Sequence, residues 1–209
     1  MRTPLAVCLS FFALGASGRC DPGVIGSVNG QPIVAIEIEE AGHEASAAQA
    51  ISPTELSRRA QAICVRDAVL EQMALARGLL RRAGYSERRQ RFDEENAARQ
   101  SATDNDRVIF GPKRLRWAQY RLIWREKLEL ALQRALAAEH PVPSPQTLQE
   151  YYRLNPARFT APGEEAPRAF ADEREHVLRL FLLSEYERAV ATKVGTAKVV
   201  WCSDPAIAR

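Results

Sequence analysis

The strongest constraint on the fold is that strand-like sequence occurs only near the two ends of the chain. VIGSVNGQPIV places two short runs rich in β-branched residues around Asn29-Gly30. This dipeptide favours a type I′ turn, whose central positions both need positive φ, so a β-hairpin is predicted. Pro32 lacks a backbone N–H, which places the second arm at a sheet edge. AKVVWC near the other end must pair with something, and the hairpin is its expected partner.

Between these ends, apolar residues recur at the spacing of amphipathic helices. Ser52 and Pro53, with Glu55 three residues after the cap, predict a helix start with a capping box. Gly78 is the expected end of that helix, and Gly195 the expected end of the last one. We expect five or six helices: one from about residue 36, and others over about 52–78, 86–100, 114–140, 144–154 and 169–194. The predicted fold is mostly α, with a small sheet made by the N-terminal hairpin and the C-terminal strand.

Residues 1–18 are typical of a secretory signal peptide, because Arg2 precedes an apolar run that ends in small residues. That run is shorter than the roughly 20 residues that cross a bilayer, so no transmembrane segment is expected. Cys20 could be a lipid attachment site, although Arg19 stands where such sites have a small residue. We therefore expect a periplasmic or otherwise extracytoplasmic protein with one domain over residues 19–209.

The charge balance argues against nucleic acid as a partner. Without Arg2, 28 basic residues face 26 acidic ones, and nucleic-acid binding needs a net basic face. The basic run around residues 79–92 is followed directly by Asp93, Glu94 and Glu95, which predicts a solvated helix face. Three acidic residues, Glu37, Glu39 and Glu40, lie early in a helix. Negative charge there interacts favourably with the positive end of the helix dipole.

The reactive side chains predict no catalytic residue, metal site or cofactor. His43, His140 and His176 are far apart in sequence, without a second ligand at metal spacing. Cys64 lies among apolar neighbours and is expected to be a buried small hydrophobe. Cys8 falls within the predicted signal, so Cys20 and Cys202 remain as the candidate disulfide pair.

Aromatic residues are the notable feature of the second half of the chain. Trp117, Tyr120 and Trp124 share one helix face at their spacing, and Tyr151, Tyr152 and Phe159 follow. These six side chains could form core, or part of them could line an open groove for unfolded chains, since aromatic rings provide large, non-directional contacts.

Three motifs in order resemble a known family. VIGSVNGQPI before a helix, LARGL closing a capped helix and PVPSPQTLQEYYRLNPARF after a long helix resemble the N-terminal domain of SurA-type periplasmic chaperones and other foldases linked to PpiC (parvulin) domains. The resemblance covers about residues 24–159, and residues 169–202 fit the returning helix and final strand of that family. In isomerase members a parvulin domain follows a segment like NPARF. Here the chain passes from Phe159 directly to the returning helix, so the resemblance implies that the catalytic domain is absent.

The resemblance also implies that the last strand runs antiparallel beside the first. Cys20 and Cys202 would then come within the Cα separation that a disulfide needs.

The function implied is that of an exported, ATP-independent chaperone-like protein that binds unfolded or extended polypeptides without prolyl isomerase activity. The alternative is a dedicated interaction or assembly subunit that binds one folded partner in the envelope or in a secretion system, through the charged segment 86–111. Residual isomerase activity is the third hypothesis.

Overall fold

The computed structural model describes residues 21–46 and 52–202. Its elements are β1 (Val24–Val28), β2 (Gln31–Val34), α1 (Ala35–Ser46), α2 (Pro53–Ala76), α3 (Tyr85–Asp104), α4 (Trp117–Glu139), α5 (Pro145–Leu154), the short 3-10 helix η1 (Pro156–Arg158), α6 (Phe170–Thr196) and β3 (Val199–Trp201). The mostly helical fold class with one small sheet is confirmed.

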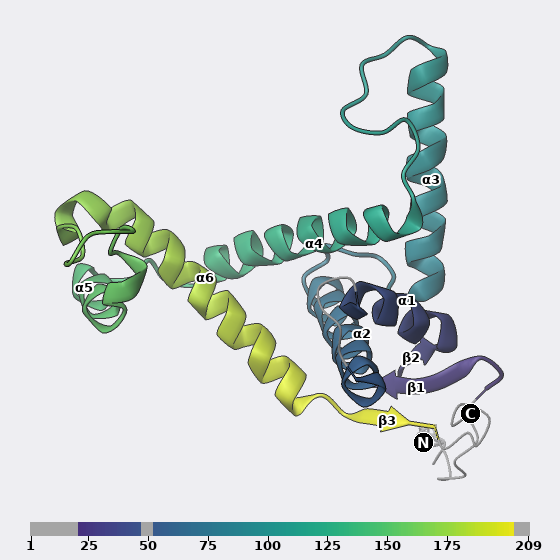
Figure 1. Ribbon diagram of the computed structural model, residues 1–209, viewed down its shortest axis with the longest axis horizontal. Helices are drawn as coiled ribbons and strands as arrows, with labels where there is room; N and C mark the ends of the chain where they lie inside the picture. The colour runs from purple at the N-terminus through teal and green to yellow at the C-terminus, as the bar shows by residue number, and fades with distance from the viewer. Residues whose placement is uncertain (1–20, 47–51, 203–209) are drawn as a thin grey trace, which may run out of the picture.

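The sheet joins the two ends of the described chain in the order β2-β1-β3 (Figure 1). The hairpin turn is confirmed, since Asn29 and Gly30 have φ of 51° and 85°. β2 lies at an edge, where Pro32 faces Ser27. β3 pairs antiparallel with β1, with Val28 opposite Val199, so the predicted partner of the last strand is also confirmed.

Asn29 does more than form the turn. Its backbone N–H donates to the carbonyl of Lys198 at 2.9 Å, and its side-chain oxygen accepts from the Lys198 N–H at 2.8 Å. Its side-chain nitrogen donates to Gln72 of α2 at 2.8 Å. One residue therefore ties the hairpin to both β3 and α2.

Close packing of β1 on β3 predicts that Gly26→Ala destabilises the protein. An added Cβ would lie 2.6 Å from Trp201 Cε3 and 2.7 Å from the Val200 oxygen. We expect a loss of about 1–3 kcal/mol in the free energy of unfolding, measured by urea denaturation. Gly42→Ala in α1 is the matched control, because nothing lies within 4 Å of its added Cβ and helical Ala is favoured over Gly by about 0.5–1 kcal/mol. Equal effects of the two substitutions would contradict this account.

The start of α2 follows its predicted cap. The Ser52 hydroxyl accepts from the Glu55 N–H at 3.3 Å, and Pro53 occupies the first turn. The Glu55 carboxylate, predicted to complete a capping box, accepts hydrogen bonds from Arg58 and Arg59.

The two glycines predicted to end helices behave differently. Gly78 has φ of 68°, and the Leu79 N–H donates to the Ala74 carbonyl at 2.9 Å, which is a Schellman motif. The prediction for Gly195 is wrong, because α6 continues through it to Thr196. The Thr196 hydroxyl donates to the carbonyl of Thr192 at 2.9 Å in this last turn.

In residues 21–46 and 52–202, buried apolar side chains form two clusters rather than one. The main cluster joins the sheet with α1, α2, α4 and the C-terminal half of α6, where Tyr186 and Val190 are buried. The second cluster has Leu148, Phe159 and Val177 at its centre. α6 therefore connects a body to a small lobe built on α5.

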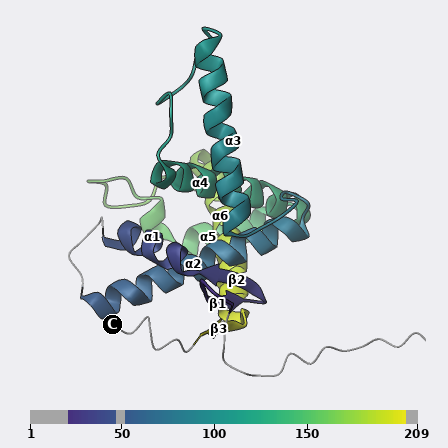
Figure 2. The same cartoon turned by 90° about the vertical axis from the view of Figure 1, so that its right-hand side faces the viewer.

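The molecule is extended, with two arms. In Figures 1 and 2, α3 projects away from the body, and Figure 1 shows the α5 lobe at the far end of α6. In the described part of the chain, no helix is long and apolar enough to cross a bilayer.

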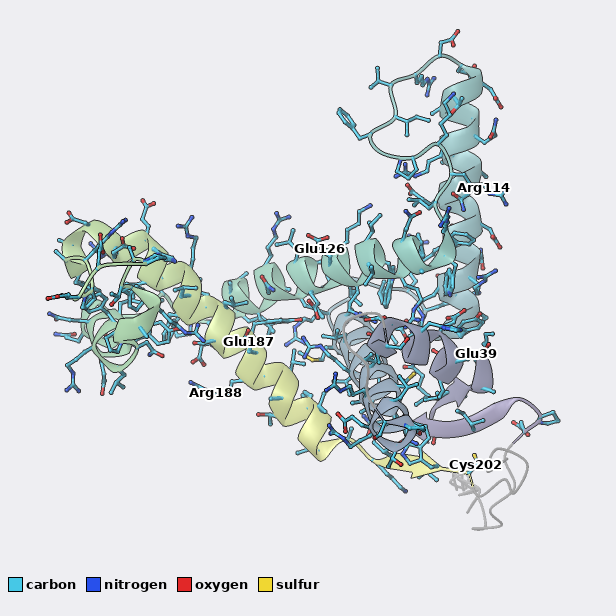
Figure 3. All side chains as sticks on the ribbon, in the orientation of Figure 1. Glu39, Arg114, Glu126, Glu187, Arg188 and Cys202 are labelled. Atoms are coloured by element: carbon cyan, nitrogen blue, oxygen red, sulfur yellow. The ribbon has the colours of Figure 1, made fainter. Side chains whose placement is uncertain are left out.

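Cys202 follows β3 at the edge of the body, where Figure 3 labels it. Its N–H donates to the Ile25 carbonyl at 2.9 Å, and its sulfur is disulfide-bonded. The predicted partner, Cys20, lies outside the described residues, so the pairing of these two residues stays a prediction.

Candidate functional site

The first three predicted aromatic residues lie on α4, against the base of α3. Tyr120 and Trp124 are buried and Trp117 is half-buried. The Trp117 ring stacks on Tyr120 with centroids 5.7 Å apart. Phe92 of α3 meets the same two rings edge-on, at 5.3 and 5.5 Å. These rings join α3 to α4.

The other three predicted residues lie in the α5 lobe. The rings of Tyr152 and Phe159 are 4.9 Å apart, and Tyr151 meets Phe181 of α6 edge-on at 5.5 Å. Phe159 is buried. The six predicted side chains therefore contribute to two separate clusters and do not come together as one surface.

An open cavity of about 480 Å³ lies where α3, α4 and the connection after α2 meet. Two of the predicted residues, Tyr120 and Trp124, form part of its wall. Its other apolar residues are Leu79, Leu80, Ala98, Leu115, Ile123, Leu128 and Ala131. Leu79 remains 40% exposed, so apolar surface is accessible from solvent at this site.

Charged side chains of both signs surround the cavity. Glu95 is paired with Arg99 at 2.8 Å, and Arg91 with Glu87 at 2.9 Å. Glu94 and Lys127 also line it, and both are exposed. The site therefore combines an apolar floor with a rim that is close to neutral.

Arg88 holds the α3 side of this cavity in place. Its guanidinium donates to Glu71 of α2 at 2.9 Å and to Glu37 of α1, and it lies 5.5 Å from the centre of the Trp124 ring. Arg88 is only 5% exposed. The prediction of a solvated face for this segment is wrong at Arg88, because two carboxylates from distant parts of the chain enclose it.

Glu37 is also buried, so the dipole interpretation of the early acidic residues is incomplete. Its carboxylate accepts from the Val34 N–H at 2.9 Å as well as from Arg88. Burial raises the pKa of Glu37, and Glu71 adds to this, which together outweigh the opposite effect of Arg88. One cation shared by two carboxylates leaves the cluster with excess negative charge. Glu39 is the one exposed residue of these three early acids (Figure 3).

A second ionic cluster attaches α4 to α1 and α2. Arg125 donates to Asp67 at 2.7 Å and to Glu44 at 2.5 Å. Arg121 lies 3.5 Å from Asp67. The main helix of the cavity is therefore held to the body by charged as well as apolar contacts.

Among the described residues, Cys64 and the histidines form no reactive arrangement. Cys64 is buried, as predicted, and burial raises its pKa to about 12, which keeps the thiol protonated. His176 bonds Glu173 at 2.8 Å. Across residues 21–46 and 52–202, no three His, Cys, Asp or Glu side chains gather as a metal site.

Sequence reasoning missed the charged clusters, although α2 carries a signal for them. Asp67 and Glu71, four residues apart, both fall within its buried stripe. An acidic residue in an apolar stripe needs a partner, because an unpaired charge is costly to bury. That signal predicts a buried cation but does not identify it as Arg88 or Arg125.

Comparison of the chain with protein-family models, curated proteins and solved structures found no match. The resemblance to SurA-type chaperones stays a prediction from the sequence motifs.

Proposed function

We propose that this protein is an exported, ATP-independent chaperone-like protein that binds unfolded or extended polypeptide segments without prolyl isomerase activity. The observation that carries the proposal is the open apolar cavity on α4. Its volume of about 480 Å³ suits a few apolar side chains and is far too small for a folded domain.

The chemistry of the cavity supports a contact with many different segments. Leucine, isoleucine and aromatic side chains provide apolar area without demanding a particular hydrogen-bonding partner. The mixed charges of the rim do not select one sign of ligand charge. Such a site holds apolar side chains of a client and releases them without any covalent step.

The connection between η1 and α6 supports the absence of isomerase activity. Only residues 159–169 separate Arg158 from Phe170, at the position where the resemblance would place a parvulin domain. The Arg168 N–H donates to the Phe159 carbonyl at 3.1 Å, which closes this connection.

The experiment is suppression of aggregation of a chemically unfolded client by the purified protein. We expect suppression near stoichiometric ratios, and we expect Leu79→Ser/Ile123→Ser to weaken it by roughly tenfold or more, because two apolar contacts are lost. The matched control is Leu122→Ser/Leu130→Ser, which changes exposed residues of α4 outside the cavity. Circular dichroism checks that each variant is folded.

Failure of the parent protein to suppress aggregation would overturn the proposal. Equal losses in the two double variants would show that the cavity is not the site. A single stoichiometric partner in a pull-down, without chaperone activity, would favour the dedicated interaction subunit. Turnover of a proline peptide would establish the isomerase hypothesis.

A further inference from the structure

The loop between α3 and α4, residues 105–116, exposes two large apolar side chains. Val108 is 85% exposed and Phe110 is 88% exposed. Figures 1 and 2 both show this loop on the projecting arm, away from the sheet and the α5 lobe. An exposed aromatic residue on a projecting arm indicates an interaction surface.

The backbone of the loop is held in this conformation by α3. Arg99 donates to the carbonyl of Phe110 at 3.2 Å and to that of Pro112 at 3.0 Å. Asn96 bonds both backbone groups of Leu115, at 2.8 and 3.2 Å. Val108 and Phe110 are therefore exposed on a loop whose backbone is held in place by hydrogen bonds.

Cations flank the exposed apolar pair. Arg107, Lys113 and Arg114 are exposed, and none of the three forms an ion pair with another residue of the described chain. Figure 3 labels Arg114 beside α3. Asp104 and Asp106 are the acidic residues at the start of the loop, so basic residues prevail.

The size and charge of this surface favour a lipid bilayer over a folded protein. A specific protein interface buries roughly 1,200–2,000 Å², whereas the loop presents two apolar side chains on a narrow arm. A bilayer accepts a small apolar insertion, and anionic headgroups add attraction for each nearby cation.

We propose that loop 105–116 docks on an anionic phospholipid surface. Val108 and Phe110 enter the headgroup region, while Arg107, Lys113 and Arg114 contact lipid phosphates. The contact is peripheral and reversible, and it does not depend on the function proposed for the cavity.

The test is co-sedimentation with vesicles of phosphatidylcholine, with and without phosphatidylglycerol. We expect binding that needs phosphatidylglycerol and weakens with salt. Val108→Ser/Phe110→Ser should weaken it at least about tenfold. Lys113→Gln/Arg114→Gln should weaken it roughly 25-fold, since each cation contributes about a fivefold gain. The matched control is Val142→Ser, which removes a side chain that is 90% exposed in the connection after α4, and it should bind like the parent protein.

Equal binding to both kinds of vesicle, or binding that survives both double variants, would overturn the proposal. The proposal would also be overturned if the parent protein bound no vesicles but formed a dimer in analytical ultracentrifugation, and if the loop variants lost that dimer. A membrane contact made by another part of the chain would be kept by every variant, so it would not produce the expected losses. Because aggregation suppression is measured without vesicles, failure of one proposal leaves the other intact.

Discussion

Replacing Arg88 by leucine is expected to lower the free energy of unfolding by about 3–5 kcal/mol. The substitution removes the cation that Glu37 and Glu71 share, and both carboxylates stay buried. Glu71 is only 1% exposed, and it also accepts from the Gly84 N–H at 2.8 Å. Breaking a buried ion pair from one side is costly because the remaining charge keeps its desolvation penalty.

Urea denaturation followed by circular dichroism measures this loss. Arg91→Leu is the control on the same helix, because it removes only a partly exposed pair with Glu87 and should change stability by about 0.5 kcal/mol or less. A loss below about 1 kcal/mol for Arg88→Leu would show that the cluster does not hold α3.

The deficit of Arg88→Leu is also expected to depend on pH. The pKa of Glu37 is already raised in the native protein by burial, and removing Arg88 raises it further. A carboxyl group with a raised native pKa stabilises the fold at low pH and loses that contribution as pH rises through the native pKa. The deficit should therefore be largest at neutral pH and shrink as the pH falls through the raised pKa of Glu37. A deficit independent of pH would contradict this.

Trp124→Ala is expected to cost a similar amount, about 3–5 kcal/mol. Trp124 is 9% exposed and belongs to the main cluster, and its ring lies under the Arg88 guanidinium. Its loss leaves a void and removes a contact of the buried cation. Trp124→Phe keeps most of the apolar contact and should cost less than half as much in the same urea measurement. Equal losses for the two variants would mean that packing volume is not the cause.

This expected loss decides how the proposed binding function is best tested. A Trp117→Ala/Trp124→Ala variant changes stability and the cavity together, so lost activity would have two explanations. Leu79 and Ile123 line the same cavity and are only partly buried. Substitutions there change the binding surface with less effect on the fold.

Elements set by local interactions could be predicted from the sequence. Asn29-Gly30 forms its turn because the required φ values depend on these two residues. Ser52 and Gly78 form hydrogen bonds with backbone groups of the same helix end. Their positions in the sequence are therefore enough to predict where α2 begins and ends. Gly195 shows the limit of such reasoning. α6 passes through it because glycine permits a helix end without requiring one.

By itself, the sequence determined the helices, the hairpin and the pairing of the last strand, because these follow from periodicity, turn chemistry and the need of a strand for a partner. Only the tertiary structure decided which charges are buried and where the aromatic residues meet. Arg88 and Glu37 are 51 residues apart, and periodicity assigns a side chain to a helix face without saying what that face meets. For the same reason, the six aromatic residues that the sequence placed in one group lie in two clusters, since α6 carries the α5 lobe away from α4.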